Sequence, residues 1–368
     1  MGNLNDQNPA AGRPGATISE VAARAGVSRQ TVSNVLNAPG RVAPETAERV
    51  RSAIAALGYR PNRAARNLRE RASRCIGFKI AHPAGLNTLL DRFLHALADA
   101  AGSAGYHVLL FTSPESDAAA GATAASATAT MATASISDAE LACYEDLVGT
   151  GTVDAFVVAD VVVNDPRPAW CARMGVPCVC FGRPWGQEHK LYSWVDVDGG
   201  DGLAQSVDHL VARGHRRIAY LGWPEGSRVG DERRAGWDRA MRRHGLDPSG
   251  LAGGCEEDTA AVLAVARELL ALPDPPTAFA CGSDTFAVAA RLAGGLDPRG
   301  VPKVDVVGYD DSPALALMAP PMPSVRQPVD EVARRVVDLL LERIRTPGLP
   351  PEGVMLRPEL ITRGEAGR

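Results

Sequence analysis

The chain has 368 residues, of which 45% are hydrophobic and 22% charged, and its net charge is −4. This length suits two or three folded domains, and the composition is ordinary for a globular protein. No apolar run reaches the roughly 18 residues that a membrane span needs. Residues 1–16 are polar and rich in Gly and Pro, so they do not have the pattern of a secretion signal. We expect a cytoplasmic protein with a disordered tail over residues 1–16.

Charge is distributed unevenly along the chain. Residues 1–72 contain 11 Arg, no Lys and five acidic residues, which gives them a net charge of +6. Because the whole chain carries −4, the remaining residues carry −10. A basic head on an acidic body indicates that the head contacts a polyanion.

The seven cysteines do not have the spacing of a disulfide or metal framework. Their number is odd, and no Cys-x-x-Cys pair is present. Cys178 and Cys180 are the closest pair, and alternation along a strand would place both on one face. We expect reduced thiols packed in the core, with a metal or redox site as the alternative.

Residues 17–37, TISEVAARAGVSRQTVSNVLN, have the pattern of two short helices. Thr17 and Glu20 have the spacing of a capping box at the start of the first helix. Gly26 suits the left-handed residue that ends this helix, and Ser28 is a good N-cap for the second. Two short helices joined by a tight turn that contains Gly predict a helix-turn-helix.

The second helix carries polar side chains that suit DNA recognition. Arg29, Gln30 and Asn34 lie off its apolar face. Arg reads guanine edges, whereas Gln and Asn read adenine edges. The hydroxyls of Thr31 and Ser33 suit phosphate contacts. On this pattern alone, a helical hairpin with a solvated polar face is the alternative.

A third helix is predicted over residues 44–57, begun by Pro44 and ended by Gly58. Residues 59–71 are then rich in Arg, with Leu68 as their one large aliphatic side chain. A helix this short with no apolar stripe is not stable alone. A symmetric copy of the same segment on DNA would supply the missing partner.

Residues 17–69 resemble the DNA-binding head of the lactose-repressor (LacI/GalR) family. The matching segments are TISEVAARAGVSRQTVSNVLN, RVAPETAERVRSAIAALGYRPN and ARNL. The resemblance implies a DNA-binding domain over residues 17–60 and a hinge helix over residues 61–72. It implies major-groove base contacts from Arg29, Gln30 and Asn34. It implies DNA-backbone contacts from Thr17, Ser28, Thr31 and Ser33, and minor-groove contacts from Asn62, Ala65 and Leu68. In this family the hinge leucine wedges into a central CG step, and such wedges bend the duplex.

Strand-like and helix-like segments alternate through the body. The strand-like runs are residues 74–81, 106–113, 153–163, 176–182, 216–223, 276–284 and 304–311. The helix-like runs are residues 90–105, 201–215, 233–246 and 285–296. This alternation predicts parallel sheets covered by helices. The pattern restarts after WVDVDGGDG, so we expect two α/β lobes in succession.

Residues 117–139 interrupt this pattern. They are rich in Ala, Thr and Ser and carry almost no charged or aromatic side chains. Such a segment can bury little apolar surface. We expect a flexible insertion or a frayed extension of a helix.

Residues 73–363 resemble the two-lobed effector domain of the same family, which shares the fold of periplasmic sugar-binding proteins. The matching segments are VDVDGGDG, LVARGHRRIAYLGW, RRAGWDRAM, CGSD, VVGYDD and PSVRQP. In that fold ligands bind between the lobes, at the carboxyl ends of strands. The resemblance implies effector contacts from Asn87, Leu89, Arg183, Trp185, Arg233, Asp284 and Asp310. Leucines replace the family's aromatic pair at positions 89 and 90, so the sequence does not support a first-lobe stacking platform.

These residue types suit a hydroxyl-rich ligand, because Arg and Asp each make several charge-assisted hydrogen bonds. Trp185 and Trp223 would stack on a sugar ring, or would instead pack as partly buried side chains. Asp284 and Asp310 follow strands, so helix capping or turn stabilisation is their alternative role.

The chain has no Gly-x-Ser-x-Gly elbow, no phosphate-binding loop and no His-x-x-x-His pair. We therefore expect neither an enzyme nor a cofactor or metal site. An exported solute-binding protein would explain the body but not the head, and an architectural DNA-binding protein would explain the head but not the body. We expect a homodimeric transcriptional repressor, bound to a near-palindromic operator and controlled by a small effector. The resemblance to the family favours a sugar as the effector, and nucleobases and other small polar molecules are the alternatives.

Overall fold

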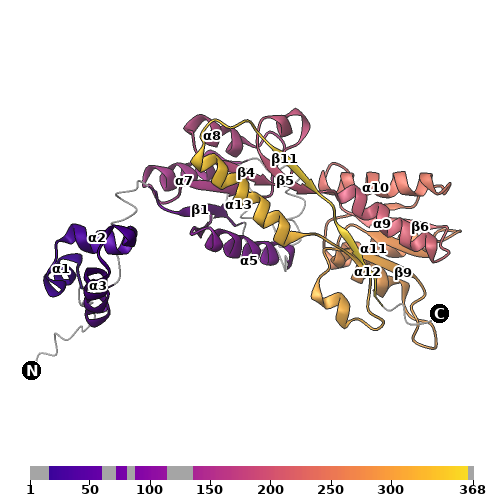
Figure 1. The fold of residues 1–368 in the computed structure, drawn as a ribbon. Coiled ribbons are helices and arrows are strands. Elements are labelled where there is room, and N and C mark those ends of the chain that lie inside the picture. Colours follow the sequence, from indigo (N-terminus) through magenta and orange to yellow (C-terminus); the bar gives the residue numbers. More distant parts are fainter. Residues whose placement is uncertain (1–15, 60–71, 81–87, 114–135, 364–368) are drawn as a thin grey trace, which may run out of the picture. The chain divides into compact units, whose positions relative to one another are not determined.

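The computed structural model describes residues 16–59, 72–80, 88–113 and 136–363. The chain divides after Ser73 into two compact units, a helical head and an α/β body (Figure 1). The predicted tail, hinge helix and insertion lie largely outside the described residues.

The described part of the head contains three helices, α1 (Ile18–Ala25), α2 (Arg29–Asn37) and α3 (Pro44–Leu57), with a short 3-10 turn, η1 (Pro39–Arg41). Gly26 and Gly58 end α1 and α3 in the left-handed conformation, at φ 66° and 60°. The three helices enclose a core of small and β-branched side chains: Val21, Ala22, Ala25, Val32, Val35, Ala47, Val50 and Ala53. The predicted helix-turn-helix and third helix are therefore both present.

The first lobe of the body is a six-stranded, all-parallel sheet in the order β11-β5-β4-β3-β1-β2. Its strands are β1 (Cys75–Lys79), β2 (His107–Phe111), β3 (Ala155–Val158), β4 (Cys178–Phe181), β5 (Trp194–Val197) and β11 (Gly353–Leu356). Its helices are α5 (Thr88–Ser103), α7 (Asp138–Gly149), α8 (Pro166–Met174) and α13 (Val329–Arg345), and the 3-10 turn η3 (Gly186–Lys190) precedes β5.

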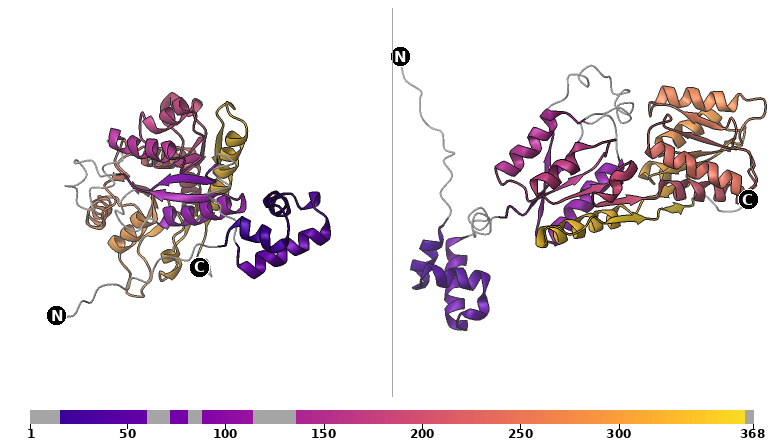
Figure 2. Two further views of the ribbon diagram at one scale, coloured as in Figure 1. Left: turned by 90° about the vertical axis from the view of Figure 1, so that its left-hand side faces the viewer. Right: turned by 90° about the horizontal axis from the view of Figure 1, so that it is seen from above.

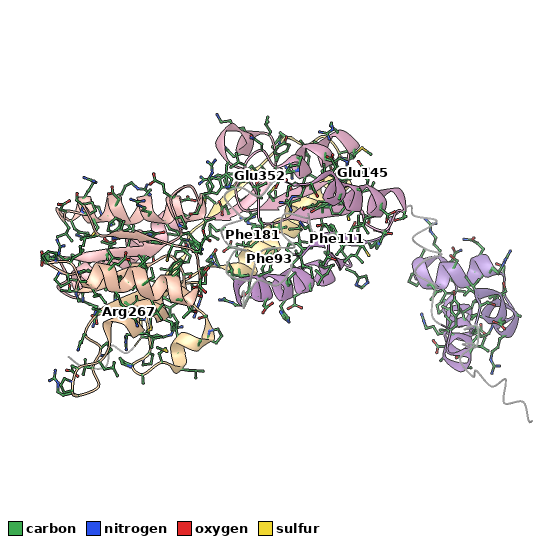
Figure 3. All side chains as sticks on the ribbon, turned by 180° about the vertical axis from the view of Figure 1, so that it is seen from behind. Phe93, Phe111, Glu145, Phe181, Arg267 and Glu352 are labelled. Atoms are coloured by element: carbon green, nitrogen blue, oxygen red, sulfur yellow. The ribbon has the colours of Figure 1, made fainter. Side chains whose placement is uncertain are left out.

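Side chains on both faces of this sheet are apolar, as a parallel sheet covered by helices requires. Ala155 and Val157 of β3 pack in the core beneath α5 and α13, whereas Phe156 packs beside Tyr144 of α7. On the α5 side, Phe93 stacks on Phe181 with ring centroids 4.3 Å apart, and Figure 3 shows these two rings together.

The second lobe is a six-stranded sheet in the order β12-β10-β9-β8-β6-β7. Its strands are β6 (Ile218–Gly222), β7 (Ala252–Gly254), β8 (Ala278–Cys281), β9 (Asp305–Tyr309), β10 (Ser324–Arg326) and β12 (Glu359–Ile361). Its helices are α9 (Gly199–Ala212), α10 (Val229–Arg243), α11 (Thr259–Leu270) and α12 (Asp284–Gly294), with the 3-10 turn η4 (Pro313–Leu317) after β9. Only β12 runs antiparallel to its neighbour in this sheet.

The two lobes are not successive segments of the chain, which corrects the sequence-based expectation. The chain passes from the first lobe to the second at Asp198, returns at Gln327–Pro328, and passes again at Arg357–Pro358. Helix α13 and strand β11 therefore belong to the first lobe, as the yellow segments of Figure 1 and Figure 2 show. α13 packs there because its apolar stripe continues the core beneath α5.

The strand predicted over residues 153–163 is shorter in the structure. β3 ends at Val158, because Asp160 turns the backbone into the left-handed region at φ 51°. The Arg167 guanidinium holds this turn by donating from Nη2 to the carbonyls of Ala159 and Asp160, each at 3.1 Å. The last residues of the predicted 117–139 insertion are also structured, since Ser137 caps α7 and Asp138 begins it.

Candidate functional site

Helix α2 is held firmly in the head by its cap and its core contacts. Ser28 Oγ accepts the Thr31 amide at 3.1 Å and so caps the first turn. Val32 and Val35 are buried against the other two helices. Arg49 of α3 donates to the Ala25 carbonyl at 3.3 Å, which ties α3 to the end of α1. The side chains of α2 that point away from this core therefore stand on a rigid element.

The exposed face of α2 carries the predicted base-reading residues. Arg29 and Gln30 are exposed and Asn34 is half-buried. Gln30 Nε2 donates to Asn34 Oδ1 at 3.0 Å, so the two amides lie side by side one helical turn apart. Each amide keeps a further donor or acceptor beyond this bond, of the kind that can meet base edges in a major groove.

The four residues predicted to contact the DNA backbone lie at helix starts or on α2. Thr17 and Glu20 form the capping box of α1, with the Thr17 amide 2.6 Å from Glu20 Oε2. The hydroxyls of Ser28 and Thr31 lie 2.9 Å apart, and Ser33 is half-buried on α2. Helix N-termini of this kind attract phosphate. The predicted hinge residues Asn62, Ala65 and Leu68 lie outside the described residues.

Arg233 is the charged centre of the body. Its side chain projects from α10 and is 6% exposed, with the guanidinium carbon 3.7 Å from the Tyr309 ring centroid and 5.4 Å from that of Trp223. Nη1 donates to the Gly282 carbonyl, and Nη2 lies 3.9 Å from Asp310 Oδ1. Arg233 Nε and the Tyr309 hydroxyl are both buried without a hydrogen-bond partner among the described residues. Buried polar atoms left unpaired in this way are costly, and such atoms in a native protein commonly have a functional reason.

Close packing of α9 on α10 sets the position of Arg233. A Cβ added at Gly236 would lie 2.1 Å from the Gly200 carbonyl oxygen, so the helices cross where neither has a side chain. A Cβ at Gly199 would lie 3.1 Å from Cγ of Arg233. The spacing of Arg233 and Gly236 thus has a steric cause. Gly236 lets α10 approach α9, and Arg233, one turn earlier, reaches the carboxyl ends of the strands.

The turn after β9 carries Asp310 in a strained backbone. Asp310 and Asp311 both have positive φ, at 99° and 52°, which non-glycine residues rarely adopt. The Asp310 carboxylate accepts from Gln327 Nε2 at 2.7 Å. Asp311 is held by Arg326 at 2.6 Å and by Arg363. Strain that is maintained by this many partners is typical of a functional turn.

Three contacts join the first lobe to the second at this junction. Arg92 of α5 donates to the Asp310 carbonyl at 3.1 Å. Arg183, which follows β4, pairs with Glu232 of α10 at 3.0 Å. The Arg228 guanidinium lies 5.7 Å from the centroid of the Trp185 ring. The facing edges of the two lobes therefore hold four of the predicted effector residues: Arg183, Trp185, Arg233 and Asp310.

The other three predicted effector residues have different surroundings. Leu89 packs against the first-lobe core, and Asn87 lies outside the described residues. The Asp284 carboxylate is buried and accepts the Ser312 amide at 2.5 Å and the Ser324 hydroxyl at 2.6 Å. Burial raises the pKa of Asp284 to about 6. The two carboxylate oxygens of Asp284 thus already bind strand β10 and the loop that follows Asp310.

The sequence analysis missed several polar residues at this junction. Glu257 follows β7 and accepts a hydrogen bond from the Ser283 hydroxyl. Asp196 of β5 accepts the Arg183 amide at 3.1 Å. β7 is a three-residue strand with two glycines, a composition that is uncommon in strands, so position 257 could not be recognised as the end of a strand. Arg92 and Glu232 lie on helices, and the sequence does not indicate that their side chains contact the opposite lobe.

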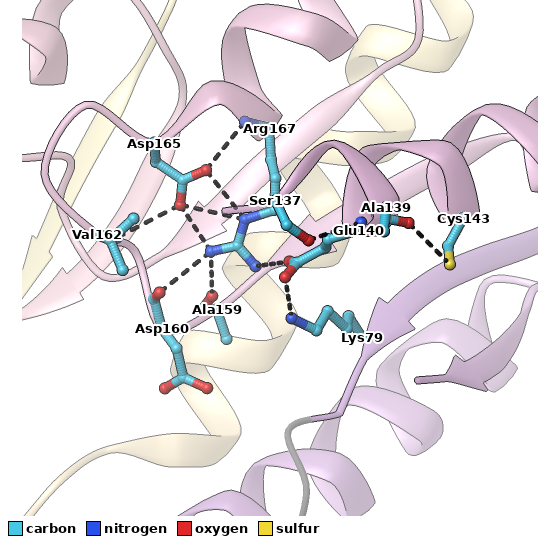
Figure 4. Close-up of polar contacts among 10 residues, drawn as sticks. All are labelled: Lys79, Ser137, Ala139, Glu140, Cys143, Ala159, Asp160, Val162, Asp165 and Arg167. Carbon is cyan, nitrogen blue, oxygen red and sulfur yellow. Dashed lines mark hydrogen bonds and ion pairs between the residues drawn. The ribbon is translucent and has the colours of Figure 1, made fainter. Parts of the chain in front are cut away.

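A buried charge cluster stands at the carboxyl edge of the first-lobe sheet (Figure 4). Arg167 pairs with Asp165 at 2.6 Å and lies 3.6 Å from Glu140, which pairs with Lys79 at 2.6 Å. The four charges compensate one another, and Arg167 also fixes the turn at Asp160. These contacts stabilise the turn that follows β3.

Two surface hollows lie elsewhere on the body. One of 360 Å³ is lined by Arg213, His215 and Asp305, and one of 520 Å³ lies between α5 and α13. Among the described residues, no three side chains gather as metal ligands. None of the described helices has the length and apolar character to cross a bilayer.

Comparisons with known proteins agree with this geometry. Residues 17–62 match the lacI family of bacterial regulatory proteins, and residues 207–364 match the periplasmic binding protein-like domain. The transcriptional regulator CelR of Thermobifida fusca is 33% identical over 94% of this chain and 97% of its own length. The ribose operon repressor of Escherichia coli K12 is 28% identical over 95% of this chain and its full length.

Two solved structures are similar over nearly the whole chain. The lac repressor dimer bound to its operator has a TM-score of 0.73 and 25% identity, covering 95% of this chain and 98% of that one. The complex of the regulator CelR with cellobiose has a TM-score of 0.64 and 30% identity, covering 96% and 100%. These relatives are transcriptional regulators and not enzymes. The chain therefore belongs to the lacI family of bacterial regulatory proteins.

Proposed function

We infer that this protein is a cytoplasmic transcriptional repressor that binds an operator as a homodimer and responds to a small molecule held between its lobes. The observation that supports the effector-binding part of the proposal is Arg233, a buried arginine at the lobe junction whose Nη2 lies 3.9 Å from Asp310 Oδ1. The polar face of α2 supports the DNA half.

In this proposal the head reads DNA through α2. Arg29, Gln30 and Asn34 contact base edges in the major groove, and Thr17, Ser28, Thr31 and Ser33 contact phosphates. Asn62, Ala65 and Leu68 act in the minor groove, with Leu68 at a central CG step. Two heads on two half-sites require a near-palindromic operator. A lac repressor relative has been solved as a dimer on its operator, which supports this assembly.

The effector in this proposal lies against Arg233, Asp310, Arg183 and Trp185, with Trp223 as a stacking surface. Asn87 is an additional contact, whereas Leu89 and Asp284 act by shaping the site. Charged side chains and aromatic rings together are typical of sugar recognition. The cellobiose in the solved CelR relative supports a sugar.

The effector would act by changing how the lobes meet. Arg92, Arg183 and Trp185 of the first lobe all contact second-lobe residues that belong to the proposed site or adjoin it. A ligand that alters these contacts shifts the balance between two lobe arrangements, with a coupling of about 1–3 kcal/mol.

Selection of genomic fragments by the purified full-length protein, followed by sequencing, tests the proposal. We expect a shared palindrome with a central CG step, and a changed affinity for it in the presence of one sugar from a panel. Fragments with no common site would instead favour an architectural DNA-binding protein. A ligand response with no DNA binding at all would favour a solute-binding protein.

The Arg233→Ala variant tests separately whether the proposed site binds the effector. We expect the variant to bind the selected operator and to have lost its response to the effector, because the central charge of the site is gone. Arg234→Ala is a matched control, since Arg234 is exposed on the same helix. A normal response from Arg233→Ala would exclude this residue from the effector site.

A further inference from the structure

Carboxylates outnumber cations around Arg233. Asp310 lies 3.9 Å away, and Glu257 and Asp196 are close enough for their charges to act on the same guanidinium. Glu232, the residue before Arg233, is a fourth carboxylate, but it is paired with Arg183. One guanidinium therefore faces three carboxylates. The charge of Arg183 also acts on Asp196, whereas Glu257 has no ion pair of its own among the described residues.

Glu257 is fixed with its carboxylate at the junction. The Ser283 hydroxyl donates to its Oε1, and the Thr285 hydroxyl also bonds to the side chain. Burial, with the nearby negative charge of Asp310, raises the pKa of Glu257. Its position after β7 puts it on the same sheet edge as Gly282 and Asp310, which follow β8 and β9.

Two other arginines reach the junction, but both are engaged. Arg92 bonds to the Asp310 carbonyl, and Arg228 lies on the Trp185 ring. In the first-lobe cluster, Lys79 and Arg167 are matched by Glu140 and Asp165. Arg233 is thus the cation that an anionic ligand would reach without displacing these contacts, and there it would also meet the carboxylates of Asp310, Glu257 and Asp196.

We propose that the site binds an uncharged polyhydroxylated molecule and rejects its phosphorylated and carboxylated forms, with Glu257 as the residue that sets this selectivity. The Glu257 carboxylate accepts hydrogen bonds from ligand hydroxyls, while Arg233 Nη2 donates to a ligand oxygen. This inference rests on the proposed function, because it describes the effector of the same site.

The charge effect is large enough to measure. At an effective dielectric constant of about 20, a monoanion held about 6 Å from one uncompensated carboxylate binds roughly 100-fold more weakly than its neutral analogue. Loss of a charge-assisted hydrogen bond to a neutral sugar weakens binding roughly tenfold.

The test compares two pools of probes on the full-length protein by calorimetry and thermal stabilisation. The neutral pool contains cellobiose, maltose, trehalose, glucose, galactose and ribose. The anionic pool contains glucose 6-phosphate, ribose 5-phosphate, glucuronate and galacturonate. We expect binding from the neutral pool only. Binding from the anionic pool, or from neither pool, would overturn the inference.

Variants then assign the selectivity to Glu257. Glu257→Gln should bind the active neutral sugar roughly tenfold more weakly and should bind its anionic form better relative to the neutral one. Glu257→Asp keeps the charge and should still reject the anion. Glu268→Gln, at the far end of α11 and exposed, is the matched control and should behave as the unmodified protein. Unchanged affinities in Glu257→Gln would refute the assignment.

These results separate the inference from the proposed function. Operator selection needs no effector, so a protein that selects a palindrome but binds an anionic sugar contradicts only the inference. A protein that selects no operator contradicts the proposed function, whichever sugar it binds.

Discussion

Replacement of Arg167 by Met should destabilise the first lobe strongly. The Arg167 side chain is 4% exposed and its guanidinium pairs with Asp165, whose side chain is 1% exposed. Met fills a similar volume but has no charge and no hydrogen-bond donor. The variant leaves the Asp165 carboxylate buried without its cation, while Lys79 still neutralises Glu140 at 2.6 Å.

The cost follows from these contacts. Removal of one partner of a buried ion pair costs about 3–5 kcal/mol, because the other charge stays uncompensated. The carbonyls of Ala159 and Asp160 also lose their donor, at about 1 kcal/mol each where water cannot replace it. Since the turn is partly open to water, we expect a total loss of about 4 kcal/mol in the free energy of unfolding.

Urea denaturation followed by circular dichroism measures this loss. Arg173→Met on the same helix is the control, because Arg173 is exposed and should cost less than about 1 kcal/mol. Adding Asp165→Asn to Arg167→Met should recover about half of the loss. A loss below about 1 kcal/mol at neutral pH would refute the view that this pair supports the lobe.

Three further predictions concern the head and the second lobe. Gln30→Ala should change the preferred base at one or two positions per half-site without weakening binding to all sequences. Sequencing of the selected DNA measures this preference, and a uniform loss of affinity would contradict the prediction. Leu68→Ala should remove the preference for a central CG step and leave a salt-dependent background, whereas an unchanged footprint would exclude the hinge role. For Asp284, the folded-state pKa of about 6 lies above its ordinary value of 3.8, so its contribution to stability is present below about pH 4 and lost as the pH rises through 6. Asp284→Asn should therefore be more stable than the unmodified protein above pH 6 by about 2 kcal/mol, and melting curves that differ equally at pH 4 and pH 7 would contradict this.

The head could be predicted closely because its signals are local. The capping box at Thr17, the left-handed Gly26 and the cap at Ser28 each act within one helical turn. The apolar spacing that identifies α2 also separates its buried face from Arg29, Gln30 and Asn34. Near neighbours in sequence therefore determine both the helix boundaries and the candidate reading face.

The body was predicted less completely because its arrangement depends on distant contacts. The apolar stripe of α13 is strong, but nothing in residues 329–345 indicates that it packs in the first lobe and not in the second, which precedes it in sequence. β7, β10 and β12 have three residues each, too few for a strand pattern. The contact between Arg92 and Asp310 joins positions 218 residues apart, and no local pattern predicts it.

The contacts of Asp310 connect the proposed effector site with a passage of the chain between the lobes. Gln327, whose amide holds the Asp310 carboxylate at 2.7 Å, lies where the chain leaves β10 for α13 and returns to the first lobe. The Asp310 carbonyl is held from the first lobe by Arg92. A ligand that hydrogen-bonds to the Asp310 carboxylate must compete with Gln327 or share the carboxylate with it, and either change acts directly on an interlobe passage. In the proposed function the same aspartate would bind the effector and transmit its presence, and the turn with two consecutive positive φ angles sets its position.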